Sequence, residues 1–333
     1  MSVTLHTYDE ILAAGWEKLV EQSPYATWFQ TPEAYRFYSA IPDEMMPFVV
    51  GVVESDTLTG VVVGYLTREK SRIKQYFTRR AIVIGGPLLD EHISAEALTK
   101  LLRAVVRESG NPIYIETRNF HDYFPFRGVF EACGWEYKPH LNFHVNTTSI
   151  ETIDAHLGKN RKRDIRVSRR DGATIIEQPT IEQVRAFYNI LCTLYISKVK
   201  TPLFSWHFFE TLYHLPNAHF LLVEYEGEIQ GGTLCVGLAG KALYEWFVCG
   251  LDGRYKTIFP SELATYAGLC YAATNGYPLF DMMGAGTPNE TYGVRDFKAR
   301  FGGELVEHGR FLKICNRLLF AIGKTGVEIL KRS

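Results

Sequence analysis

The spacing of hydrophobic and polar residues predicts one order of secondary-structure elements, and the chain repeats that order twice. Residues 5–38 begin the first half with a pattern typical of a strand followed by two short helices. The other elements predicted for the first half are hairpin strands at 48–53 and 61–66, a strand at 82–88, a helix at 94–109, a strand at 113–117, a short helix at 126–133 and a strand at 135–145.

The second half opens with a basic helix at 159–170 and a longer helix at 181–198. The elements predicted after them are hairpin strands at 220–225 and 231–237, a strand at 242–248, a helix at 261–274, a strand at 279–283, a short helix carrying Lys298 and a strand at 305–314. The repeated order predicts an α/β (α+β) fold with two tandem units of about 150 residues, each a mixed sheet flanked by helices. A polar boundary near 147–150 gives domains at 1–148 and 149–333, with the candidate site in the second.

The short helix near the end of the chain carries the strongest candidate for chemistry. Its start is marked by Thr287 and Pro288 and its end by two glycines, and Val294, Phe297 and Phe301 are spaced as one apolar stripe. Lys298 falls at the edge of that stripe, where its stem would be buried and its ammonium would point along a cleft. A fixed positive charge there suits a developing oxyanion. The alternative is a solvated lysine on a surface helix.

The segment at 159–170, KNRKRDIRVSRR, contains seven cationic residues and one aspartate. Clusters of Arg and Lys bind phosphates, so this helix is predicted to bind a polyanion, either a tRNA backbone or the pyrophosphate of a nucleotide-linked substrate. The residues expected to do so are Lys159, Lys162, Arg163, Arg166, Arg169 and Arg170. The alternative is a solvated face paired with acidic neighbours.

Three further residues outside these two helices are candidates for substrate binding. Tyr255 and Lys256 lie in the turn at 250–262, where a coenzyme A enzyme would have a glycine-rich loop for pyrophosphate. Pro260 removes one backbone donor from that turn, which weakens the coenzyme A interpretation and leaves an ordinary loop as the alternative. Arg36, on a predicted aromatic helix, is a candidate for binding an acidic substrate.

Composition excludes several classes of protein. The 333 residues carry a net charge of -1 and are 46% hydrophobic, as in ordinary globular proteins, so phosphate binding must be local. We expect a cytoplasmic protein, because the sequence lacks an apolar run of about 18 residues and a signal-peptide pattern. Apolar and basic residues alternate at 311–331, which favours either peripheral contact with anionic lipid or a docked terminal helix. His140 and His144 lack a third ligand, so no metal site is expected.

Three stretches together resemble the FemABX aminoacyltransferase family: QSPYATWFQTPEAYRFY, KNRKRDIRVSRRDGATI and, above all, YGVRDFKARFGGE. The resemblance covers almost the whole chain. It implies two GNAT-like (acyl-CoA N-acyltransferase-like) domains. It further implies transfer of an amino acid from aminoacyl-tRNA to an amine of a nucleotide- or lipid-linked peptidoglycan precursor, forming a cell-wall interpeptide bridge, with no cofactor.

The resemblance also assigns roles to residues. Lys298 would be the catalytic residue that stabilises the transferring carbonyl, and Arg36 would contact the precursor. Tyr292 and Arg295, in the same motif as Lys298, are expected to bind substrate. The chain departs from the family before the second hairpin, where Phe204 and Phe208 stand in place of an Arg and a Tyr. This departure leaves the acceptor open.

Three hypotheses follow for the activity. In the first, the acceptor amine attacks the aminoacyl ester directly, with Asp296 or the departing ribose oxygen as the base. In the second, the protein is an acyl-CoA-dependent N-acetyl- or acyltransferase. In the third, it is a non-catalytic binder of tRNA or nucleotide sugar. The sequence does not fix the amino acid, the acceptor or the oligomeric state.

Overall fold

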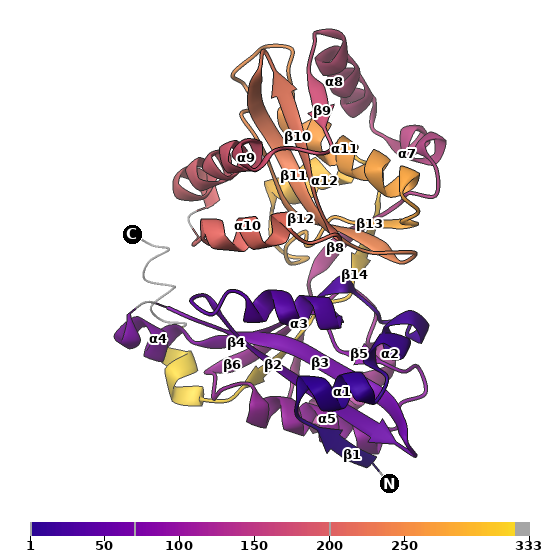
Figure 1. The fold of residues 1–333 in the computed structure, drawn as a ribbon, viewed down its shortest axis with the longest axis vertical. Helices are drawn as coiled ribbons and strands as arrows, with labels where there is room; N and C mark the ends of the chain where they lie inside the picture. Colours follow the sequence, from indigo (N-terminus) through magenta and orange to yellow (C-terminus); the bar gives the residue numbers. More distant parts are fainter. Residues whose placement is uncertain (1, 70, 200, 324–333) are drawn as a thin grey trace. The chain divides into compact units, whose positions relative to one another are not determined.

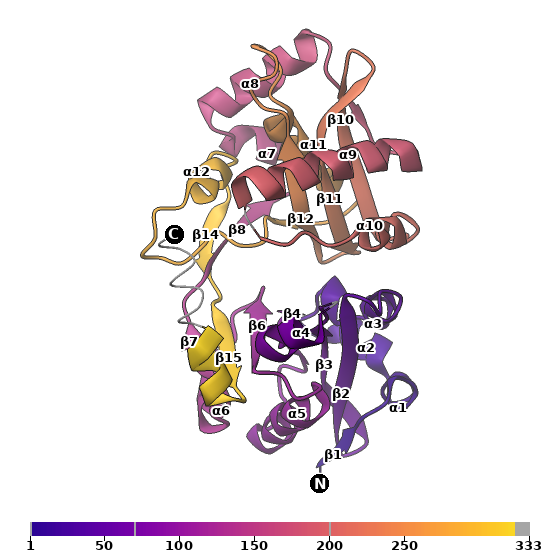
Figure 2. The ribbon, with the colours of Figure 1, turned by 90° about the vertical axis from the view of Figure 1, so that its left-hand side faces the viewer.

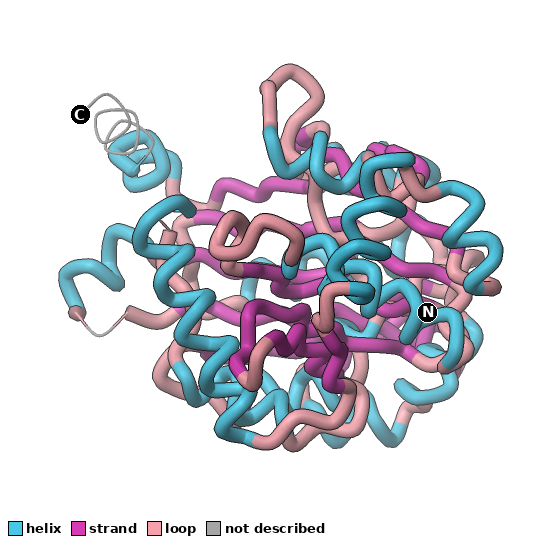
Figure 3. Tube along the Cα trace, turned by 90° about the horizontal axis from the view of Figure 1, so that it is seen from above, coloured by secondary structure: helices cyan, strands magenta, loops and turns pink. Residues whose placement is uncertain are grey.

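The computed structural model describes residues 2–69, 71–199 and 201–323. The chain forms two compact units, and each is a mixed sheet with helices against it (Figure 1). The first unit contains the chain up to His140 together with the segment from Glu307 onward, and the second contains Leu141–Val306. Seen from above in Figure 3, the strands are flanked by helices. The predicted α/β class with mixed sheets is confirmed.

The sheet of the first unit has the strand order β1-β2-β3-β4-β6-β15-β7, with β5 paired to β3. β4 and β6 run parallel, and they are joined by the long helix α5. The strands are β1 (Ser2–Leu5), β2 (Met45–Glu54), β3 (Thr57–Thr67), β4 (Arg80–Gly85), β5 (Leu88–Leu89), β6 (Tyr114–Asn119), β7 (Glu136–Lys138) and β15 (Arg310–Ile314). The helices are α1 (Tyr8–Ala13), α2 (Trp16–Gln22), α3 (Pro32–Ser39), α4 (Arg72–Thr78), α5 (Ala95–Glu108) and α6 (Arg127–Ala132).

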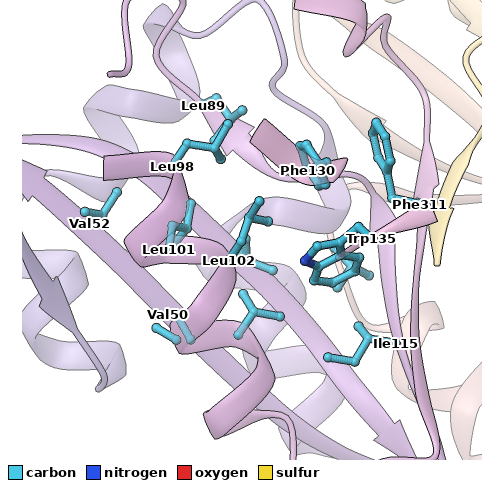
Figure 4. Packing of buried hydrophobic residues seen from close by; sticks show 14 of the residues in the cluster. Val50, Val52, Leu89, Leu98, Leu101, Leu102, Ile115, Phe130, Trp135 and Phe311 are labelled. Atoms are coloured by element: carbon cyan, nitrogen blue, oxygen red, sulfur yellow. The ribbon is translucent and has the colours of Figure 1, made fainter. Parts of the chain in front are cut away.

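The core of the first unit lies between α5 and the sheet. Ser94 caps the start of α5 with its side chain, and Leu98, Leu101 and Leu102 of this helix are buried against β2 (Figure 4). At the far side of this core, the ring of Phe311 stacks on that of Phe130 with centroids 4.0 Å apart. The last described strand is therefore part of the first unit's core.

The sheet of the second unit has the order β14-β8-β13-β12-β11-β10-β9. The strands are β8 (Leu141–Asn146), β9 (Thr174–Ile176), β10 (Ala218–Tyr225), β11 (Glu228–Leu238), β12 (Ala242–Gly250), β13 (Leu279–Asp281) and β14 (Glu304–Glu307). The helices are α7 (Ile150–His156), α8 (Lys159–Arg170), α9 (Ile181–Leu194), α10 (Trp206–Tyr213), α11 (Pro260–Thr274) and α12 (Gly293–Ala299). Figure 2 shows α12 leading into β14. α11 packs on β11 and β12, and it covers the strand that carries Glu245.

The two units exchange strands, which the sequence pattern did not reveal. The stretch predicted as one strand at 135–145 is split at Pro139 and His140 into β7 and β8, and β8 pairs with β13 in the second unit. The stretch predicted at 305–314 is split near Gly309, whose φ is 63°, into β14 and β15, and β15 pairs with β6 in the first unit. The observed units therefore differ from the expected domains 1–148 and 149–333.

Several local elements also differ from the expected ones. Helices α4, α7 and α10 and strand β9 are not among the elements expected from the sequence, and the helix expected at 181–198 ends at Leu194 and continues as a π-helical turn at Tyr195–Val199. The amphipathic segment expected at 311–331 begins in β15, and its residues 324–331 lie outside the described residues. None of the helices within 2–69, 71–199 and 201–323 combines the length and apolar composition that a membrane span requires.

Candidate functional site

Lys298, on α12, is buried with only 6% of its surface exposed. Its ammonium donates hydrogen bonds to three successive backbone carbonyls, those of Met282, Met283 (3.2 Å) and Gly284 (2.7 Å). The expected position, with the ammonium pointing along a cleft from the edge of an apolar stripe, is therefore not the one observed. Val294 is 42% exposed and does not belong to such a stripe. Lys298 instead has its charge fixed in a cage of carbonyl oxygens.

The carbonyl cage is shaped by the backbone after β13. Met283 and Gly284 have φ values of 50° and 82°, in the left-handed region that turns successive carbonyls toward one side. The Asp281 carboxylate accepts hydrogen bonds from the Met283 amide (2.7 Å) and from the Asn142 side chain (2.7 Å). The Asn142 amide oxygen in turn accepts from the Gly284 amide (2.9 Å). Asn142 lies on the exchanged strand β8, so this strand helps to fix the loop that holds Lys298.

Asp281 is 1% exposed and remains the acidic partner of this loop. Burial by itself would raise the pKa of its carboxyl group, but the hydrogen bond from His144 (3.2 Å), the charge of that histidine and the Asn142 bond together hold the pKa below its ordinary value. The carboxylate is therefore kept ionised next to the carbonyl cage.

Glu245, on β12, supplies a second buried acid near Lys298. Its carboxylate is 3% exposed, and neither oxygen meets hydrogen-bond geometry with any described residue. Burial raises the pKa of Glu245 to about 7, opposed by the charge of Lys298 and by the nearby hydroxyls of Thr233 and Thr265. Burial likewise lowers the pKa of Lys298, while Glu245 and then Asp281 oppose that change. The arrangement is typical of a functional site, where charges are buried at a cost to stability.

The basic helix α8 is joined to α12 by a buried arginine. Arg161 is 3% exposed, donates to the Glu262 carboxylate and lies over the rings of Phe297 (4.5 Å) and Phe301 (5.1 Å). The amide of Gly158, which precedes α8, also donates to the carbonyl of Arg300, which ends α12 (3.0 Å). The helix that carries Lys298 therefore rests on the start of α8.

The other face of α8 is a continuous set of exposed cations. All six residues predicted from the sequence to bind a polyanion are exposed: Lys159, Lys162, Arg163, Arg166, Arg169 and Arg170. Arg163 pairs with Asp164 and Arg170 with Asp171. The four other cations form no ion pair with any residue that the structure describes. We call these six residues the cationic face of α8.

Tyr292 and Arg295, the two candidate residues in the same motif as Lys298, have different environments. Arg295 donates to the backbone carbonyls of Ala285 (2.8 Å) and Thr287, so its guanidinium holds the loop that follows the carbonyl cage. Tyr292 precedes α12, is 40% exposed and lies against Gly286. Tyr292 is thus the more accessible of the two.

The remaining predicted residues lie in an earlier part of the second unit or in the first unit. Tyr255 is half-buried, with its hydroxyl 3.4 Å from the carboxylate of Glu226, and Lys256 is exposed. Arg36 lies on α3 of the first unit and donates to the hydroxyl of Tyr8 (2.6 Å). The structure therefore brings Tyr292 and Arg295 together with Lys298 on one short segment.

Four site residues were missed by the sequence analysis: Asn142, Glu245, Asp281 and Arg161. A usable signal existed for the two acids, because each is a lone carboxylate in a strand of apolar residues, in ALYEWFVCG and LFD. A usable sequence signal existed for Arg161 as well. Its spacing from Asp164, Ile165 and Ser168 puts these residues on a single helix face, which is the buried face of α8.

Comparisons with known proteins support the fold. No protein-family model matches the chain, and no curated protein sequence does. Among solved structures, FemX is similar with a TM-score of 0.73 at 13% identity, covering 96% of this chain and 99% of FemX. The C-terminal domain of a putative lysylphosphatidylglycerol synthetase from Agrobacterium fabrum has a TM-score of 0.58 at 13% identity, covering 97% of each chain.

A third similar structure is a tandem GNAT protein from the clavulanic acid biosynthesis pathway, with a TM-score of 0.57 at 10% identity, covering 95% of this chain and 99% of that one. At such low identity these similarities concern the fold and leave the substrate open. The protein thus has a FemABX-like tandem GNAT fold.

Proposed function

We propose that the protein is an aminoacyltransferase that moves an amino acid from aminoacyl-tRNA to an amine of a peptidoglycan precursor. The observation that carries this proposal is the buried Lys298 ammonium, fixed by three carbonyls and joined through α12 to the cationic face of α8. A polyanionic donor would bind the cationic face of α8, and a single oriented charge would serve the reacting ester. The similarity of the fold to FemX agrees with this activity.

The reaction needs a neutral amine and stabilisation of one oxyanion. The amine nitrogen attacks the ester carbonyl carbon, the C–N bond forms and the carbonyl oxygen becomes an oxyanion. Collapse breaks the C–O bond to the ribose, whose oxygen takes up a proton as the amine nitrogen loses one. Lys298 would stabilise the oxyanion by exchanging one carbonyl partner for it. The contact with Met283, at 3.2 Å, is longer than the contact with Gly284, at 2.7 Å, and is the one we expect to be replaced.

The start of α11 favours tRNA over coenzyme A as the donor. In a coenzyme A enzyme, the amides at such a helix start would receive the pyrophosphate. Here the amide of Ser261 donates to the Asp252 carboxylate (3.1 Å), the amide of Phe259 donates to the Ser168 hydroxyl (2.9 Å), and Pro260 has no amide hydrogen. These donors are already used, and the Asp252 carboxylate would repel a pyrophosphate.

Mass spectrometry of reaction mixtures tests the proposal. The protein is incubated with mixed charged tRNA and either nucleotide-linked or lipid-linked muropeptide, and in parallel with acetyl-coenzyme A. We expect the muropeptide to gain the mass of one amino acid only when charged tRNA is present. Acetylated product alone would support the acyl-CoA hypothesis instead. Salt-sensitive tRNA binding without product from either donor would identify a non-catalytic binder.

Neutralising part of the cationic face of α8 is expected to weaken binding of charged tRNA. The double change Lys162→Gln and Arg166→Gln removes two exposed charges that have no ion-pair partner among the described residues. The slope of log affinity against log salt should become shallower by about 1 to 2, because fewer counterions are released on binding. Filter binding at several salt concentrations measures this slope.

The matched control for these changes is Arg170→Gln, because Arg170 already pairs with Asp171. Its loss should change the slope less than loss of either unpaired cation. Unchanged affinity and slope in the double variant would remove the cationic face of α8 from the donor site.

A further inference from the structure

α4, a short helix of the first unit, exposes three large apolar side chains on one side. Ile73, Tyr76 and Phe77 are 75%, 50% and 46% exposed, and their spacing of three and four residues puts them on the same helix face. A helix of seven residues gains little stability of its own, and an apolar face of this size turned to water is unfavourable. Such a face normally marks a surface that becomes covered by something else.

The sequence around this apolar face is rich in cations. The sequence at 68–80, REKSRIKQYFTRR, has six cationic residues and one glutamate in a chain whose net charge is -1. These cations are Arg68, Lys70, Arg72, Lys74, Arg79 and Arg80. A short amphipathic segment with aromatic and aliphatic side chains amid Lys and Arg is the pattern of a helix that lies in the interface of an anionic membrane.

A pocket of mixed charge lies beside α4. It has a volume of about 580 Å³, and its lining includes the cations Arg68 and Arg79 and the acids Asp43 and Glu69, together with Met46 and Leu66. The Nε of Arg79 is buried and has no hydrogen-bond partner among the described residues, and the guanidinium lies 5.2 Å from the Tyr76 ring. An unpartnered guanidinium donor beside apolar side chains suits a phosphate at the level of lipid headgroups.

A second exposed apolar segment lies at the same end of the first unit. Residues 317–323 are helical, and within them Leu318 and Ile322 are 72% and 50% exposed. Phe320 of this helix packs edge-on against Tyr114 at 5.5 Å, and the Tyr114 hydroxyl accepts a hydrogen bond from Arg80, two residues after α4 (3.5 Å). Both exposed segments are thereby tied to the start of the neighbouring strands β4 and β6 (Figure 1).

We propose that α4 and the helix at 317–323 form a docking surface for a bilayer that contains anionic phospholipid. The apolar side chains enter the interface between headgroups and acyl chains, while the flanking cations remain at the level of the lipid phosphates. No residue of the Lys298 site takes part, so this surface is independent of the proposed transfer reaction.

Flotation with lipid vesicles tests the docking surface on the full chain. One set of vesicles contains phosphatidylcholine alone, and in the other about a third of the lipid is phosphatidylglycerol. We expect the protein to float with the anionic vesicles, less at physiological than at low salt, and to stay behind with the neutral ones. The triple change Ile73→Ser, Tyr76→Ser and Phe77→Ser should lower the bound fraction about tenfold or more, because it removes the apolar anchor.

Two matched variants distinguish this surface from nonspecific hydrophobic adsorption and from the other basic region, which is the cationic face of α8. Phe124→Ser removes a different exposed aromatic side chain of the first unit (73% exposed) and should leave flotation unchanged. The double change Lys162→Gln and Arg166→Gln on α8 should also leave it unchanged. A circular dichroism spectrum like that of the parent protein confirms that the triple variant is folded.

Equal flotation of the triple variant and the parent protein would overturn the proposal, as would equal binding to neutral and anionic vesicles. Flotation with neither kind of vesicle would overturn it as well and would redirect the search to a protein partner. Lys298→Met should float like the parent protein. Failure of the transfer assay and failure of membrane docking are therefore separate results.

Discussion

Replacing Lys298 with methionine is expected to lower kcat for the proposed aminoacyl transfer by about a hundredfold or more, with a much smaller change in KM. Methionine has nearly the length of lysine but no donor, so the oxyanion would form without its one oriented charge. The donor would still bind, because the cationic face of α8 is untouched. Single-turnover transfer from charged tRNA to the muropeptide separates the chemical step from binding.

The structure adds a cost to this change that the sequence did not indicate. Lys298 bonds to the carbonyls of Met282, Met283 and Gly284, and methionine leaves these acceptors unsatisfied. A loss of about 1–3 kcal/mol in the free energy of unfolding is expected, partly offset because a buried charge is removed. Urea denaturation alongside the kinetics distinguishes a folded, inactive variant from an unfolded one.

Lys198→Met is the matched control, since Lys198 is an exposed lysine of the same unit with no proposed role in the site. It should retain most of the parent's kcat and stability. A folded Lys298→Met variant with near-normal kcat would remove Lys298 from the catalytic role. Loss confined to KM would instead make it a binding residue.

The parts of the fold that could be predicted from sequence are those with local signals. The helix at 94–109 and the basic helix at 159–170 are observed as Ala95–Glu108 and Lys159–Arg170, because an amphipathic period and end signals lie within each segment. The exchange of β8 and β15 could not be predicted in this way. A strand's pattern shows that one face is buried but does not show which sheet it joins.

The candidate site likewise contains residues that have a local sequence signal and residues that depend on long-range strand pairing. Lys298 could be singled out from its motif, and the exposed cations of α8 from their number. The carbonyl cage depends on left-handed backbone at Met283, a residue type that seldom adopts it, and on Asn142, which arrives from the exchanged strand. Neither fact is present in the local sequence, because both follow from long-range pairing.

Replacing Glu245 with glutamine is expected to raise stability and lower activity together. In the folded protein burial raises the pKa of Glu245 to about 7, whereas its ordinary value is 4.5. Between these two pH values the unfolded chain releases the proton and the folded chain keeps it, so stability of the parent protein falls as pH rises from 4.5 to about 7 and then levels off. Glutamine has no such proton, so the variant lacks this loss.

The expected gain in the free energy of unfolding is near zero at pH 4.5. Above pH 7 it approaches about 3 kcal/mol, which is the free energy that corresponds to the rise of the Glu245 pKa from 4.5 to about 7. Urea denaturation at pH 5 and pH 8 measures the difference. Glu290→Gln, which changes an exposed acid just before α12, is the control and should change stability at neither pH. An equal effect of Glu245→Gln at both pH values would contradict the linkage.

Activity should move in the opposite direction, because the Glu245 carboxylate opposes the fall in the pKa of Lys298 that burial causes. Without it the ammonium loses its proton at a lower pH, so the alkaline limb of the kcat profile should shift to lower pH. A purely structural acid would leave that limb in place while the stability rose. A more stable variant with an unshifted pH profile would therefore show that Glu245 has no part in keeping Lys298 charged, and that its buried carboxylate is retained for another reason.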